Sequence, residues 1–140
     1  MDPHKHQSGV MLLEVLIALL IFAVGVLGLV GMQAVAIKLT AESKYRAEAA
    51  SYAEQLLSQM WADDIANLRT YYDSEEGGEK YTAWKTDIQA AGGLPGTSLS
   101  GNAPSVVIDP ATNQVTITIR WQAPDAQAAH RYVTVARLNP

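Results

Sequence analysis

The chain contains no cysteine, so disulfide bonds and thiolate metal sites are both excluded. The same absence removes any indication of a redox compartment. Proline is scarce, with 6 in 140 residues, and none lies between Val10 and Leu68. Because proline interrupts the hydrogen bonding of a helix interior, its absence allows one long helix over this range.

An excess of positive charge is also missing from most of the chain. From Lys38 onward, 9 Lys and Arg residues stand against 12 Asp and Glu residues. A nucleic-acid-binding domain normally has a basic stripe that attracts the phosphate backbone over a distance. We therefore expect no nucleic-acid partner for this part of the chain.

The sequence offers no cluster of catalytic or metal-ligating side chains. His130 is the only histidine after residue 9, and the serines lack a nucleophile-elbow context. The acidic segment 73–79 has part of the spacing of a calcium loop, but Trp84 stands where a bidentate glutamate is required. The glycine-rich segment 92–102 lacks the ending of a phosphate-binding loop. We predict a protein that is not an enzyme, with no catalytic residues, no cofactor and no metal, and a solvated acidic loop at 73–79.

A long hydrophobic run extends from Val10 to Ile37, where Glu14 and Gln33 are the only side chains that are neither apolar nor glycine. As a helix this run would be about 42 Å long, more than the ~30 Å hydrocarbon core of a bilayer. Its Leu, Ile, Val and Phe residues favour insertion by about 5 to 10 kcal/mol, whereas one acidic residue costs about 3 kcal/mol at the bilayer centre. The run predicts a transmembrane helix, and Glu14 within it requires a functional explanation.

Three interpretations of this run account for only some of its features. A core helix of a soluble protein seldom stays apolar on every face for seven turns. A secretory signal cleaved after Ala36 fits the small residues at 34 and 36, but the stretch from Val15 to Val30 is longer than the usual signal core. An uncleaved membrane anchor explains the length and leaves Glu14 without a role.

The residues from Gly9 to Leu19 read GVMLLEVLIAL. This string resembles the class III signal of type IV pilins and the related pseudopilins. In that family a prepilin peptidase cuts after the glycine on the cytoplasmic side and methylates the new N-terminus, and the hydrophobic helix becomes the filament core. The resemblance therefore implies cleavage between Gly9 and Val10 and N-methylation of Val10. The family usually has Phe or Met at this first mature position, so valine puts the efficiency of methylation in doubt more than cleavage.

Cleavage would place a cationic amine on Val10, four residues before Glu14. Positions four residues apart share one face of a helix, one turn from each other. In hydrocarbon an ammonium and a carboxylate each have a large desolvation cost, which pairing partly cancels. The pair can form within one subunit, or Glu14 can reach the amine of a neighbouring subunit. The family resemblance implies the second arrangement.

Three glycines, Gly25, Gly28 and Gly31, recur at three-residue intervals in the run. Each costs about 1 kcal/mol of helix stability relative to alanine. Small residues at this spacing support close packing of membrane helices, and local softness of the helix is the alternative interpretation. The segment from Gly25 to Gln33 resembles PilV-type minor pilins more than major pilins, which commonly have a proline in this helix.

The resemblance also implies a location and a set of partners. The N-terminus would lie in the bacterial cytoplasm and the C-terminal domain in the periplasm, before incorporation into a pilus at the cell surface. The expected partners are the prepilin peptidase, the major pilin and other minor pilins, the inner-membrane assembly platform and a tip adhesin. A minor pseudopilin of a type II secretion system would share the same N-terminal chemistry.

Beyond Lys38 the pattern becomes amphipathic and then strand-like. Apolar residues at three- and four-residue steps predict a helix that presents one face to a core, comprising Tyr45, Ala49, Tyr52, Ala53, Leu56, Leu57, Met60, Trp61, Ile65 and Leu68. Residues 81–91 predict a short amphipathic helix or an irregular packed segment. Alternating patterns predict strands at 105–108, 115–121 and 131–138, joined as an antiparallel meander. We expect an α+β pilin-like fold with a leader at 1–9, a hydrophobic helix at 10–37 and a globular domain at 38–140.

Overall fold

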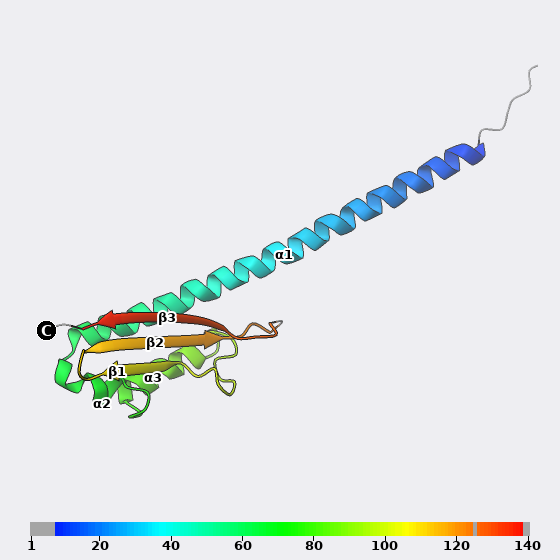
Figure 1. Cartoon of the computed structure of the whole chain (residues 1–140). Helices are drawn as coiled ribbons and strands as arrows, with labels where there is room; N and C mark the ends of the chain where they lie inside the picture. The colour runs from blue at the N-terminus through cyan, green and yellow to red at the C-terminus, as the bar shows by residue number, and fades with distance from the viewer. Residues whose placement is uncertain (1–7, 125, 139–140) are drawn as a thin grey trace, which may run out of the picture. The chain divides into compact units, whose positions relative to one another are not determined.

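The computed structural model describes residues 8–124 and 126–138 (Figure 1). Its elements are α1 (Ser8–Ala62), the 3-10 helix η1 (Ile65–Asn67), α2 (Leu68–Tyr72), α3 (Glu79–Gln89), β1 (Ser105–Asp109), β2 (Gln114–Trp121) and β3 (His130–Arg137). The predicted α+β fold, a long N-terminal helix followed by a small antiparallel sheet, is confirmed. The chain divides into two units between Ala41 and Glu42.

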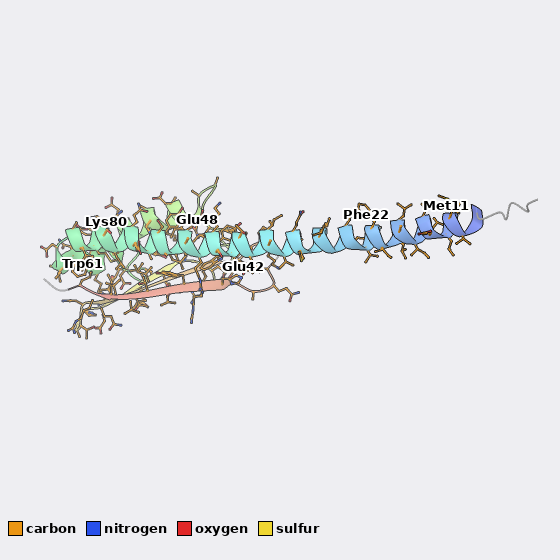
Figure 2. The ribbon with its side chains drawn as sticks, turned by 90° about the horizontal axis from the view of Figure 1, so that it is seen from above. Met11, Phe22, Glu42, Glu48, Trp61 and Lys80 are labelled. Carbon is orange, nitrogen blue, oxygen red and sulfur yellow. The ribbon has the colours of Figure 1, made fainter. Side chains whose placement is uncertain are left out.

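The first unit contains the apolar part of α1, in which every residue from Gly9 to Thr40 is exposed. Met11 and Phe22, for example, are 70% and 71% exposed and project from the helix in Figure 2. The backbone of this part is hydrogen-bonded within the helix, as a helix in hydrocarbon requires. Its side chains therefore have no cover within this unit.

The second unit begins with the remainder of α1, which buries one face. Ala49, Ala53, Leu56 and Met60 are almost fully buried, in agreement with the predicted stripe. Trp61 was predicted to belong to this stripe, but its side chain is 56% exposed. It lies in the last turn of α1, one residue before the helix ends.

The predicted amphipathic helix does not continue to Leu68, because α1 ends at Ala62. The carboxylate of Asp64 accepts a hydrogen bond from the backbone N–H of Ala66 at 3.0 Å and caps η1. Asp63 instead pairs with Lys80 and accepts a hydrogen bond from the hydroxyl of Tyr72. Aspartates that bond locally compete with the helical backbone, which explains the break at this point.

Helix α3 packs against the rest of the second unit through three buried side chains, those of Tyr81, Trp84 and Ile88. The indole N–H of Trp84 donates to the carbonyl of Tyr52 at 2.9 Å, and the hydroxyl of Tyr81 donates to the carbonyl of Pro104 at 2.8 Å. These bonds connect α3 both to α1 and to the segment before β1. Of the two forms predicted for this region, a helix is the correct one.

The sheet has the order β1-β2-β3, and both pairs are antiparallel. In β2 the buried side chains alternate with half-buried ones, as predicted, and they are Val115, Ile117, Ile119 and Trp121. These residues share one core with the buried face of α1. The predicted strand boundaries agree with the observed ones to within a residue.

The C-terminal strand is held by contacts at its end in addition to its pairing with β2. The Leu138 side chain is 1% exposed, and its backbone N–H donates to the carbonyl of Asn113 at 2.9 Å. The Arg137 side chain donates to the carbonyl of Thr112 at 3.0 Å. The end of β3 is thus attached to the β1–β2 turn without a disulfide.

The outer edge of β1 is covered by the start of the acidic segment. The carboxylate of Asp73 accepts hydrogen bonds from the backbone N–H groups of Glu75 at 2.8 Å and Ile108 at 3.1 Å. The backbone N–H of Ser74 donates to the carbonyl of Val106 at 2.9 Å. Asp73 is 3% exposed, so the expectation of a solvated loop is wrong at this residue, although Glu75 and Glu76 are exposed.

Candidate functional site

The residues of the predicted processing site lie in the first turns of α1. Gly9, Val10 and Glu14 are all helical and exposed, and Val10 is 72% exposed. Val10 and Glu14 are one turn apart on the same face of the helix. In the uncut chain the Val10 nitrogen is a peptide nitrogen without charge, so it can pair with Glu14 as an ammonium only after cleavage.

No described residue forms an ion pair with Glu14, and the sequence has no basic side chain between Ser8 and Ile37. Residues 1–7 of the predicted leader lie outside the described part of the chain. A carboxylate on a helix face that enters hydrocarbon remains costly unless a cation accompanies it. The local geometry therefore leaves room for an ammonium at position 10 or for one from another chain.

The surface around these residues is a continuous apolar cylinder. Soluble monomers seldom expose apolar patches of more than a few hundred Å². Among the described residues, α1 is the one helix long and apolar enough to cross a membrane, by length and composition. Lipid, or other helices, would be needed to cover this surface.

The three glycines of the predicted packing surface have free space around them. A Cβ atom added at Gly25, Gly28 or Gly31 would meet no atom within 4 Å outside the neighbouring helix backbone. At 100° per residue the three positions occupy a sector of about 120° on the helix. No contact within the described chain requires glycine there, so the sector is open to an approaching helix.

The alternative cleavage site after Ala36 lies inside α1, where the Ala36 carbonyl accepts a hydrogen bond from the Thr40 hydroxyl at 2.9 Å. Position 36 is thus helical in the uncut chain.

His130, considered above as an isolated histidine, takes part in a polar cluster in the second unit. Its Nε2 atom lies 3.8 Å from the Glu42 carboxylate, and its ring stacks on Trp121 with ring centres 5.8 Å apart. Glu42, Ser43 and Arg46 complete the cluster. Sequence reasoning missed this cluster because its members lie on α1, β2 and β3, and no local spacing connects them.

The acidic segment that was compared with a calcium loop serves a structural purpose at its first residue. Asp73 directs its two oxygens to backbone N–H groups, as described for the edge of β1. Among the residues that the structure describes, no group of three or more His, Cys, Asp or Glu side chains is placed to hold a metal ion.

Comparison with known proteins gives no relative of this chain: no family model, no curated protein and no solved structure matches it.

Proposed function

We propose that this chain is a minor pilin of a type IV pilus, of the PilV type. A prepilin peptidase cuts it between Gly9 and Val10 and methylates the new N-terminus. Helix α1 holds the cut protein in the bacterial inner membrane, with the globular domain in the periplasm, until it enters the filament. The observation that supports this proposal most is a single carboxylate, Glu14, one turn from Val10. It lies in the exposed part of α1, residues 10–37, where every other side chain except Gln33 is apolar or absent.

The free energy of burying Glu14 gives the physical reason for the cleavage. A carboxylate at the centre of a bilayer costs about 3 kcal/mol, and removal of one member of a buried ion pair costs about 3 to 5 kcal/mol. An amine created four residues earlier supplies the missing charge without another basic residue. Pairing between subunits would also fix the axial position of each helix against its neighbour, since one charge must meet the other.

The place of the protein in the pilus follows from the same resemblance. A minor pilin would join other minor pilins in an initiation or tip complex that supports pilus assembly, adhesion or twitching motility. During its incorporation it would contact the major pilin and the assembly platform in the inner membrane. A tip adhesin would be a further partner. The open sector at Gly25, Gly28 and Gly31 offers neighbouring helices a surface without side chains.

The first test is the N-terminus of the native protein from membrane or pilus fractions. Intact mass and N-terminal sequencing should give a chain that starts at Val10, with or without one methyl group. A chain that starts at Ile37 would identify a secreted periplasmic module, and a chain that retains residues 1–9 would refute the proposal.

The second test is Glu14→Ala, with Gln33→Ala as the matched control in the same run. Glu14→Ala should leave leader removal intact and reduce incorporation into sheared filaments by at least about tenfold, because the partner amine loses its counter-charge. Gln33→Ala should assemble normally. Normal incorporation of Glu14→Ala would show that the proposed pairing is unnecessary.

A minor pseudopilin of a type II secretion system would pass both tests on its own filament. Purification of the cross-linked protein with its neighbours distinguishes the two systems, since each contains its own major subunit.

A further inference from the structure

The globular unit has a polar cavity where α1 meets the end of β2 and the start of β3. Its volume is about 300 Å³, and its lining residues are Glu42, Ser43, Arg46, Trp121 and His130. All five belong to the second unit, and in Figure 2 the labelled Glu42 lies beside the start of β3. Of these residues only Trp121 also belongs to the hydrophobic core, and pilus assembly as proposed above does not use the cavity.

The two charged residues that α1 contributes to the cavity do not form an ion pair. Glu42 and Arg46 are four residues apart, in the order that favours pairing on a helix. The structure instead places Glu42 against His130, at 3.8 Å, and Arg46 forms no ion pair with any residue in the described ranges. The cavity therefore has in its walls a carboxylate and a guanidinium that does not pair with any described acidic residue.

Trp121 forms one wall of the cavity, and its buried indole N–H has no acceptor among the residues that the structure describes. Its side chain is 2% exposed, and its indole Nε1 is the one buried side-chain N or O atom of the described residues that lacks a partner. Buried donors are nearly always satisfied, and leaving one unpaired is costly. The Trp121 side chain lines the cavity, so a ligand bound there would change the surroundings of this indole.

We propose that this cavity binds a phosphoethanolamine group, as found in the headgroup of phosphatidylethanolamine. The phosphate would accept hydrogen bonds from the guanidinium of Arg46, and the primary ammonium would donate to Glu42. Guanidinium groups bind phosphate through parallel hydrogen bonds. A simple anion would meet the Glu42 carboxylate and a simple cation would meet Arg46, whereas a zwitterion satisfies both.

The sequence favours a lipid as the source of this group over a soluble compound. Ser43 follows Leu39, the last large exposed apolar residue of the first unit, by only four positions. In a chain with a membrane helix, residues at this point of the sequence are close to the headgroup layer. Binding at this cavity does not depend on cleavage at Gly9 or on filament assembly.

Titration of the full-length protein in a neutral detergent tests the proposal. The chain has 3 tryptophans, so three indole N–H signals are expected in a nitrogen-15 NMR spectrum, and Trp121→Phe identifies the signal of Trp121. Short-chain phosphatidylethanolamine should shift this signal saturably. Short-chain phosphatidylcholine, which has no ammonium N–H, and short-chain phosphatidylglycerol, which has no cation, should each bind about tenfold more weakly.

The same titration with free phosphoethanolamine distinguishes a lipid headgroup from a soluble compound as the ligand. Affinity equal to that of the short-chain lipid would support the cavity chemistry with a soluble ligand, and weaker affinity would support the lipid. Equal binding of all three lipids, or no saturable shift with any of them, would overturn the proposal.

Substitutions in the cavity provide the second readout. Arg46→Gln and Glu42→Gln should each weaken the binding of phosphatidylethanolamine about tenfold, because each removes a charged hydrogen-bond partner. Glu48→Gln is the matched control, since Glu48 is on the same helix and pairs with Lys44 at 3.5 Å outside the cavity. Unchanged binding in both cavity variants would also overturn the proposal, whatever the result for assembly of the Glu14→Ala variant.

Discussion

Replacement of Asp73 with alanine tests how the outer edge of β1 is stabilised. The carboxylate is 3% exposed and accepts hydrogen bonds from the N–H groups of Ile108, in a buried position, and of Glu75. An unpaired buried N–H costs about 1 to 3 kcal/mol, and the loss of the second hydrogen bond costs about 1 kcal/mol. We therefore expect Asp73→Ala to lower the free energy of unfolding by about 2 to 4 kcal/mol.

Thermal unfolding of the full-length protein in detergent, followed by tryptophan fluorescence, measures this loss. For a domain of roughly 100 residues, 1 kcal/mol corresponds to about 4 to 8 °C, so the midpoint should fall by at least about 8 °C. Asp73→Asn retains one acceptor oxygen and should show a smaller loss.

Glu75→Ala is the matched control, because it removes an exposed carboxylate from the same segment and keeps the backbone N–H that Asp73 binds. Its midpoint should stay within about 2 °C of that of the unchanged protein. If Asp73→Ala proved equally harmless, Asp73 would not be what satisfies the edge of β1, and the reasoning would fail.

Three further predictions concern the globular unit. Gly78→Ala should destabilise it by at least about 2 kcal/mol in urea unfolding, because the new Cβ would lie 2.2 Å from the backbone oxygen of Tyr71. Leu138→Ala should cost about 2 to 5 kcal/mol by the same measurement, since this side chain is 1% exposed, and a loss below about 1 kcal/mol would show that the C-terminus contributes little. The hydrogen bond from Lys80 lowers the pKa of Asp63 below 3.8, and the hydrogen bond to Asp63 raises the pKa of Lys80 above 10.5. Their contribution to stability should therefore be constant at neutral pH. It should be lost as the pH falls from 3.8 through the lowered pKa, or rises from 10.5 through the raised one. Lys80→Met should abolish the alkaline dependence and reduce the acid dependence, because the hydrogen bond from Tyr72 still lowers the pKa of Asp63.

The elements of this fold that the sequence predicts well are those whose burial follows a local period. The alternation from Val115 to Trp121 identifies a strand with one buried face, and the structure places these residues in the core. The steps from Ala49 to Met60 identify the buried face of α1 in the same way. Each segment packs against the core on one side only, so its apolar residues recur with the period of a strand or a helix. This local pattern is enough to predict which face is buried.

The features that the sequence does not predict depend on contacts between distant segments. The pairing of Asp63 requires Lys80 from another helix, and the burial of Asp73 depends on its contact with β1. The cavity at Glu42 requires the ends of β2 and β3 to come together beside α1. Local composition makes each of these acidic residues look like an ordinary solvated one.

The predicted processing site differs from the periodic elements and from the long-range contacts. Its residues are neighbours in the sequence, but its function depends on molecules outside the chain. A helix that is apolar on all sides is stable only in lipid or among other helices. In either environment Glu14 needs a cation, and no basic side chain lies between Ser8 and Ile37. The predicted cleavage would create an amine at Val10 as one source, and a neighbouring subunit would be another. Both sources require a second protein, and we therefore expect the function of this helix to lie in processing and assembly.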